Sequence, residues 1–245
     1  LVQEEATEYA WDHIKRAASD IHEVEDLQVQ LQYKAAFAQI QDSQHKFLEA
    51  TKRYFELAQT EALDEADVVD ALGKAVRCVV LAPAGPQRQR AMKLIHGDAR
   101  SAVLGSFNIL EAMYMGRFVS TEVAEAFEKA LKNHHRKVRH EDGLTLLEYA
   151  LIEHNVLAAS NLYHNISFAS LAKLLGVSPE RAESIATKMI TEDRITGVVD
   201  QIEGLLEFSR EAEHLHTWDS QIENLCLAVN GSAEAIVRKF PVFGS

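Results

Sequence analysis

Residues 167–208 read SFASLAKLLGVSPERAESIATKMITEDRITGVVDQIEGLLEF, and this stretch decides the fold of the second half of the chain. Two segments with helical periodicity, 167–175 and 178–193, are followed by two short runs, ITGVVD and LLEF. Short apolar runs separated by a few residues that include a glycine predict a β-hairpin. The preceding segment, 143–165, predicts one more helix. Three helices and a hairpin in this order predict a winged helix.

The ends of these helices carry consistent local signals. Gly176 suits the position just after a helix, where the backbone turns left-handed. Ser178 can cap the next helix, and Pro179 fits its first position. We expect that helix to bury one apolar stripe, made of Ala182, Ile185, Ala186, Met189 and Ile190.

The hairpin, or wing, offers strand edges with which a neighbouring chain can pair. Gly197 and Gly204 frame it. We therefore expect the wing to form a protein interface. The expected interface residues are Val198, Val199, Ile202, Leu205, Leu206 and Phe208.

Charge argues against the DNA binding that many winged helices perform. The chain of 245 residues carries a formal net charge of −12, with 25 basic and 37 acidic residues. The outward face of the 178–193 helix mixes both signs, through Glu180, Arg181, Glu183, Lys188, Glu192 and Asp193. A helix that reads DNA needs a cationic face to meet phosphates. A winged helix without a cationic face favours protein–protein assembly over DNA binding.

Residues 1–131 predict a tetratricopeptide-like stack of paired helices. Helical periodicity is broken every fifteen to twenty residues or so, as expected for antiparallel helix pairs. The expected helices are 4–18, 24–40, 44–59, 65–81, 87–98, 101–118 and one capped by Ser120. Asp64 can cap the helix at 65–81. The chain begins with Leu1 rather than methionine, which indicates a fragment of a longer protein.

A polar segment, KNHHRKVRHEDG at 132–143, has no apolar period, and we interpret it as a linker. Its basic residues leave open a contact with nucleic acid or an acidic partner, although a solvated loop is the more common meaning of such a run. The winged helix then spans 144–210.

Residues 214–245 predict a C-terminal helix that lies beyond a complete domain. Such a helix either folds back or joins helices of other chains. Its expected interface residues are Trp218, Ile222, Leu225 and Val229.

Catalytic and metal chemistry find little support in the sequence. His214-Leu215-His216 followed by Asp219 resembles part of a zinc-peptidase motif, but position 227, where that motif places an aspartate, is leucine. His154 is expected to pack or hydrogen-bond rather than bind metal. Cys78 and Cys226 lie far apart, which indicates free thiols in a reducing compartment. We expect no catalytic residue, no metal, no cofactor, no membrane span and no secretory signal.

The order of elements resembles the PCI domain, which is shared by the proteasome lid, the COP9 signalosome and an initiation-factor complex. The similarity is carried by LIEHNVLAASNLYHNISFASLAKLLGV, KMITEDRITGVVDQIEG, TWDSQIENLC, AGPQRQRAMKLIHGDAR and ILEAMYMGRF. These stretches, within residues 30–230, look like a PCI subunit of the signalosome. The polar stretch 132–143 and the tail after Gly231 depart from the pattern.

The resemblance implies a non-catalytic scaffold in the complex that removes Nedd8 from cullins. Its implied partners are other PCI subunits and the zinc-protease subunit pair, with the cullin-RING ligase as substrate of the complex, in cytoplasm and nucleus. Winged-helix edges and C-terminal helices would make the contacts. A proteasome-lid PCI subunit and a nucleic-acid-binding adaptor that uses 132–140 remain as alternatives.

Overall fold

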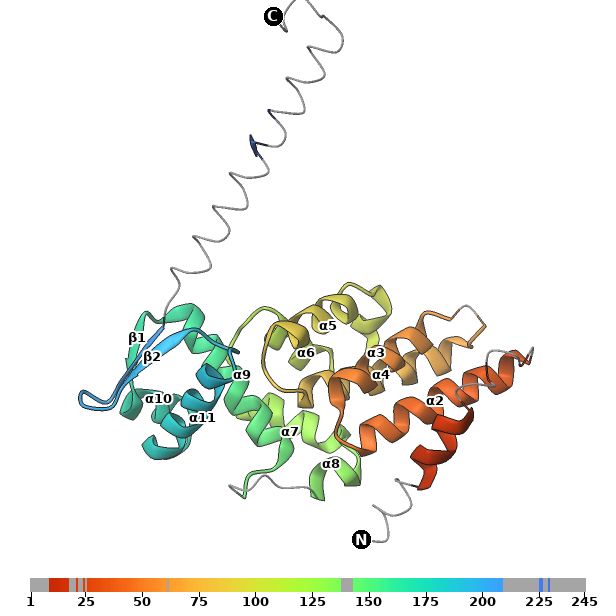
Figure 1. Ribbon diagram of the computed structural model, residues 1–245, viewed down its shortest axis with the longest axis horizontal. Helices are drawn as coiled ribbons and strands as arrows, with labels where there is room; N and C mark the ends of the chain where they lie inside the picture. The colour runs from red at the N-terminus through yellow and green to blue at the C-terminus, as the bar shows by residue number, and fades with distance from the viewer. Residues whose placement is uncertain are drawn as a thin grey trace, which may run out of the picture.

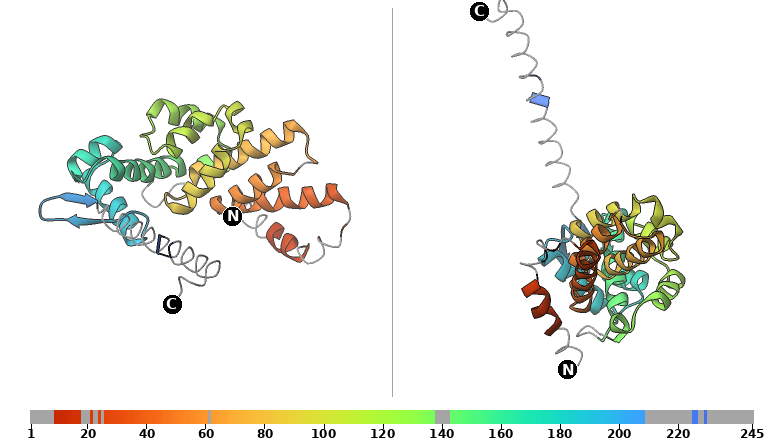
Figure 2. Two further views of the ribbon diagram at one scale, coloured as in Figure 1. Left: turned by 90° about the horizontal axis from the view of Figure 1, so that it is seen from above. Right: turned by 90° about the vertical axis from the view of Figure 1, so that its right-hand side faces the viewer.

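The computed structural model describes residues 9–17, 21, 24, 26–60, 62–137, 143–208, 225, 226 and 229. It is mainly helical, with one small sheet near the end of the described chain. The first helices and the sheet lie at opposite ends of the molecule (Figures 1 and 2). The fold predicted from the sequence, a helical stack followed by a winged helix, is confirmed.

The stack begins with helices that run back and forth. Residues 9–17 are helical, and the next helices are α2 (Leu27–Ser43), α3 (Phe47–Ala58) and α4 (Glu65–Leu81). The turn between α2 and α3 is tight, and His45 adopts a left-handed conformation there with φ of 60°. Trp11 stacks on Phe37 of α2 at 5.3 Å between ring centroids, which joins the first helix to the stack.

The second part of the stack differs from the prediction over residues 101–118. Its elements are α5 (Pro86–His96), the 3-10 helix η1 (Ala99–Val103), α6 (Phe107–Tyr114) and α7 (Thr121–Ala130). The single helix expected over 101–118 is therefore wrong, since η1 and α6 replace it. Asp64 and Ser120 occupy the N-cap positions of α4 and α7, but neither side chain makes the capping hydrogen bond.

The interpretation of 132–143 as a solvated linker is wrong for its first half. Asn133–Lys137 form helix α8, and His135 in it is buried. The physical reason is Asp42 at the end of α2, which offers His135 a buried hydrogen-bond partner that lies 93 residues away in the sequence. Residues 138–142 lie outside the described part.

The winged helix contains the three expected helices and one strand more than expected. Its elements are α9 (Leu146–Leu162), β1 (Asn165–Ser167), α10 (Phe168–Leu175), α11 (Pro179–Thr191), β2 (Gly197–Asp200) and β3 (Leu205–Phe208). Thr145 and Glu148 form a capping box at the start of α9. The caps expected further on are confirmed: Gly176 has φ of 68°, and the Ser178 hydroxyl accepts from the Arg181 amide.

Two main apolar cores result, one in the stack and one in the winged helix. The predicted stripe of α11 is buried at Ala182, Ile185, Ala186 and Met189 and half-buried at Ile190. Helix α9 packs against α4 on one side and against α10 and α11 on the other. This central helix therefore links the two parts. No described helix is long and apolar enough to cross a membrane.

Candidate protein-interaction surface

The wing belongs to a three-stranded antiparallel sheet in the order β1-β3-β2. β3 pairs with β2 so that Val198 lies opposite Glu207, and with β1 so that Ile166 lies opposite Leu206. The order makes β2 and β1 the two edge strands and places β3 between them. Strand β1 was not predicted, because three residues between two helices carry almost no strand signal.

Local contacts explain the shape of the hairpin. Asp200 accepts hydrogen bonds at one carboxylate oxygen from the amides of Ile202 and Glu203, at 2.9 and 3.1 Å, which closes the turn. Gly204 has φ of 65°, a conformation that side chains disfavour. At Gly197 a Cβ would lie 2.6 Å from the Glu207 carbonyl oxygen, so only glycine allows the two strands to approach this closely.

The predicted interface residues of the wing separate into two sets. Val198 is 61% exposed and Ile202 is 98% exposed, while Val199 and Leu205 are half-buried. Leu206 and Phe208 belong to the apolar core, so their prediction as interface residues is wrong. Alternation along the central strand β3 turns these two side chains inward and Glu207 outward.

Of the predicted C-terminal helix, the structure describes residues 225, 226 and 229. Leu225 and Val229 are helical and exposed. Trp218 and Ile222 lie outside the described residues, as does the His214-Leu215-His216 sequence. Their role as interface residues stays a prediction.

A buried polar cluster, here called the junction cluster, fixes the winged helix on the stack. It consists of Arg88, Glu153, His154 and Arg194. One oxygen of Glu153 accepts from the Ala84 amide at 3.0 Å and pairs with Arg194 at 2.6 Å. These two contacts of Glu153 therefore join the loop before α5 to the segment between α11 and β2.

The two other members of the junction cluster, Arg88 and His154, lie close to each other, and His154 also contacts the backbone at Arg117. His154 Nε2 lies 2.8 Å from the Arg117 carbonyl oxygen, and Nδ1 lies 3.4 Å from Arg88. Burial, with the nearby Arg88 charge adding to it, lowers the pKa of His154 from 6.5 to about 4. Burial also lowers the pKa of Arg88 to about 10, although Glu153 acts in the opposite direction. His154 is therefore neutral, and the expectation that it hydrogen-bonds rather than binds metal agrees with these contacts.

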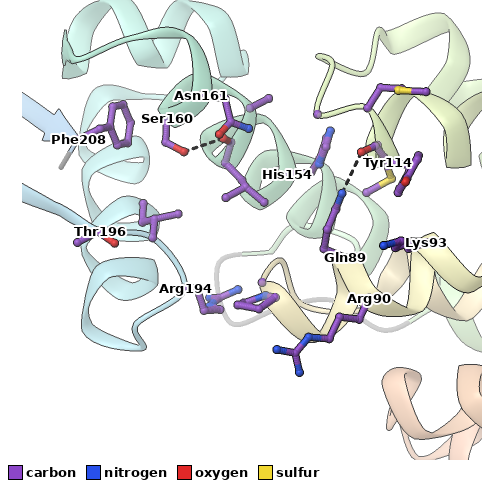
Figure 3. Close-up of a pocket in the computed structure, with 18 of the residues that line it drawn as sticks. Gln89, Arg90, Lys93, Tyr114, His154, Ser160, Asn161, Arg194, Thr196 and Phe208 are labelled. Atoms are coloured by element: carbon purple, nitrogen blue, oxygen red, sulfur yellow. Dashed lines mark hydrogen bonds between the residues drawn. The ribbon is translucent and has the colours of Figure 1, made fainter. Parts of the chain in front are cut away.

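A cleft of about 990 Å³ opens beside the junction cluster, between α5 and the winged helix (Figure 3). Arg90, Lys93 and Arg194 give its lining a cationic character. Ser160 donates to the Leu157 carbonyl oxygen at 2.8 Å, and both ring nitrogens of His154 are engaged. These two side chains are therefore not arranged as nucleophile and base.

Elsewhere in the described chain, a single group of side chains is close enough to hold a metal ion, namely Asp42, His134 and His135. It lies in the stack, away from the wing. This group was not predicted, because nothing in the sequence brings residue 42 next to residue 135.

Residues 122–210 match the PCI domain, a range that begins at α7 and includes the whole winged helix. The chain thus contains a PCI domain. It is 39% identical to COP9 signalosome complex subunit 4 of Dictyostelium discoideum over 99% of this chain, and 40% identical to the Caenorhabditis elegans and Arabidopsis thaliana proteins of that name over 88% and 85%. The chain is a homologue of COP9 signalosome subunit 4, and the predicted resemblance is confirmed. It spans between 52% and 61% of the length of these relatives.

Proposed function

We propose that this protein is a non-catalytic scaffold subunit of a COP9 signalosome, the complex that removes Nedd8 from cullins. Its proposed partners are other PCI subunits and the zinc-protease subunit pair, with cullin-RING ligases as substrates of the complex. The proposed location is the cytoplasm and nucleus. The homology to subunit 4 supports this assignment over a proteasome-lid subunit.

The observation that carries the proposal is the edge strand β2. Within the described residues β2 pairs with β3 on one side, and no further strand covers its other side. Its Val198 side chain is exposed, and the tip residue Ile202 projects fully into solvent. A strand edge with apolar side chains suits pairing with a strand of another protein.

The third helix of the winged helix supports protein rather than nucleic acid as the partner. Residues on its outer side, Glu180, Glu183 and Glu192, line a shallow depression together with Lys188. Gln201 of the wing donates to Glu183 at 2.9 Å. Phosphates would meet net negative charge there. His135, part of the proposed nucleic-acid contact at 132–140, is buried.

The exposed positions Leu225 and Val229 support a second contact through the C-terminal helix. Each such side chain contributes about 1.5–3 kcal/mol when a partner buries it, before the ordering costs of association. We propose that this helix packs with the C-terminal helices of neighbouring subunits.

Co-expression with the other signalosome subunits tests the assignment. We expect the chain to co-purify with them and not with proteasome-lid subunits. Alone, it should leave a neddylated cullin intact with or without added zinc. Turnover by the pure chain that a chelator abolishes would contradict the non-catalytic assignment.

A pair of proline variants, Val198→Pro and Val199→Pro, tests the β2 edge. Successive amides of a strand point to opposite sides, so one proline removes a group that faces β3 and the other removes one at the outer edge. We expect one variant to melt early. The other should stay folded, as judged by circular dichroism, and yet lose the partner subunit in a pull-down. If the folded variant binds the partner normally, assembly does not use this edge.

A further inference from the structure

Three titratable side chains from distant parts of the sequence meet inside the helical stack. Asp42 lies in the last turn of α2, and His134 and His135 lie in α8, which packs beneath the stack (Figure 1). Each offers one ligand atom, and these atoms all lie within 4.8 Å of one another. The carboxylate faces both rings, with one oxygen 2.7 Å from His135 Nε2 and the other 3.4 Å from His134 Nε2.

Two histidine nitrogens of this group make no hydrogen bond within the described chain. The His134 Nε2 atom is shielded from solvent, points toward Asp42 and makes no hydrogen bond of acceptable geometry. His135 is 1% exposed, and its Nδ1 also has no partner. Buried polar groups in folded proteins normally make hydrogen bonds, so a nitrogen that faces a buried carboxylate without a hydrogen bond indicates a ligand between the two.

We propose that Asp42, His134 and His135 bind a divalent transition-metal ion, with Zn²⁺ as the best match. Two imidazoles and one carboxylate are donors that suit zinc, whereas Ca²⁺ and Mg²⁺ prefer oxygen donors throughout. Ligand atoms about 2.0–2.2 Å from a tetrahedral ion lie about 3.3–3.5 Å apart. The 3.4 Å separation between Asp42 and His134 fits this spacing. His135 must withdraw from the carboxylate by about 0.7 Å to reach the same spacing.

The surroundings supply the support that metal ligands require. The Cys78 thiol is buried and donates to Asp42 Oδ1 at 3.5 Å, which orients the carboxylate as outer-shell partners do. Phe47 packs edge-on against the His135 ring at 5.8 Å between centroids. The His134 side chain is 30% exposed, so the group lies close enough to the surface for an ion to enter when this side chain moves.

Such an ion would connect two separate elements of the fold. It would join the end of α2 to α8, and α8 lies within the residues that match the PCI domain. The metal would thus clamp the helical stack to the start of that domain. Because His135 is buried and the group lies away from the wing, we assign the ion a structural role.

Zinc titration of the chelator-treated full chain, in competition with a chromophoric chelator, tests the site. We expect one Zn²⁺ per chain, and an affinity that falls by at least about 10-fold in His134→Gln and in Asp42→Asn. His134 is the safer position because its side chain is half-buried, and thermal melts establish that each variant is folded. The double variant His214→Gln/His216→Gln is the matched control and should bind as tightly as the wild type.

Cobalt substitution gives a second readout that needs no variant. Co²⁺ bound to the unmodified chain should show a spectrum of nitrogen and oxygen ligands, without a thiolate charge-transfer band. The proposal is overturned by the lack of saturable binding at equal concentrations of metal and protein, or by full affinity in both His134→Gln and Asp42→Asn. Loss of the ion in the 214/216 control overturns it too, and so does a thiolate band.

Discussion

The junction cluster and the group around Asp42 bury polar side chains in different ways. At the junction, Glu153 and His154 find partners in both the stack and the winged helix, and Arg194 Nε is the one buried atom left over. Around Asp42, the buried nitrogens His134 Nε2 and His135 Nδ1 make no hydrogen bond. Polar groups that hydrogen-bond to one another hold two units in one orientation. Histidine nitrogens that make no hydrogen bond remain available to coordinate a ligand.

The largest expected effect comes from breaking the junction. Glu153→Ala leaves the Arg194 guanidinium and the Ala84 amide without their buried acceptor. We expect a loss of about 3–5 kcal/mol in the free energy of unfolding, measured by urea denaturation. Glu192→Ala, which removes a half-exposed partner of the same Arg194, is the control and should cost about 1 kcal/mol or less. Equal losses in the two variants would mean that the buried Glu153 stabilises the fold no more than the half-exposed Glu192 does.

A pH series probes the same cluster through His154, whose pKa is lowered to about 4 by burial and the Arg88 charge. In the unfolded chain this group takes up a proton below about pH 6.5, while in the folded chain it stays neutral down to about pH 4. Its contribution to stability is therefore complete above pH 6.5 and is lost as the pH falls from 6.5 to 4. The expected loss is up to about 3 kcal/mol.

His154→Gln should flatten the dependence of unfolding free energy on pH within that window, measured by urea denaturation at each pH. The exposed His164, replaced by glutamine in the same way, is the control and should leave the slope as in the wild type. An unchanged slope in His154→Gln would show that another group governs this range.

A double substitution around Asp42 sharpens the comparison, with measurements made in the presence of chelator. Asp42→Ala alone removes the partner of His135 Nε2 and should cost about 1–3 kcal/mol. Asp42→Leu with His135→Leu removes both polar groups, so we expect much of that loss to be recovered. Glu153→Leu with Arg194→Leu should not recover stability, because the Ala84 amide stays unpaired. If Asp42→Leu with His135→Leu is less stable than Asp42→Ala, the proposed difference between this group and the junction cluster is wrong.

The sequence by itself determined the local structure of this protein. Gly176, Ser178 and Pro179 set the ends of two helices, because caps depend on neighbouring residues alone. Apolar spacing placed α3, α4 and α11, and the glycine-bounded runs placed β2 and β3. The sequence likewise carried the resemblance that the relatives confirmed.

Only the tertiary structure decided which side chains are available and which distant groups meet. Leu206 and Phe208 have the same strand character as Val198, but they lie on the face of the sheet that packs on the core, whereas Val198 lies opposite Glu207 on the outer face. The polar run at 132–143 carries no apolar period, yet His135 in it is buried because Asp42 lies opposite. Glu153 meets Arg194, and Asp42 meets two histidines, through packing between elements. Periodicity reports the environment of a residue along its own helix or strand, and contacts between separate elements leave no trace in it.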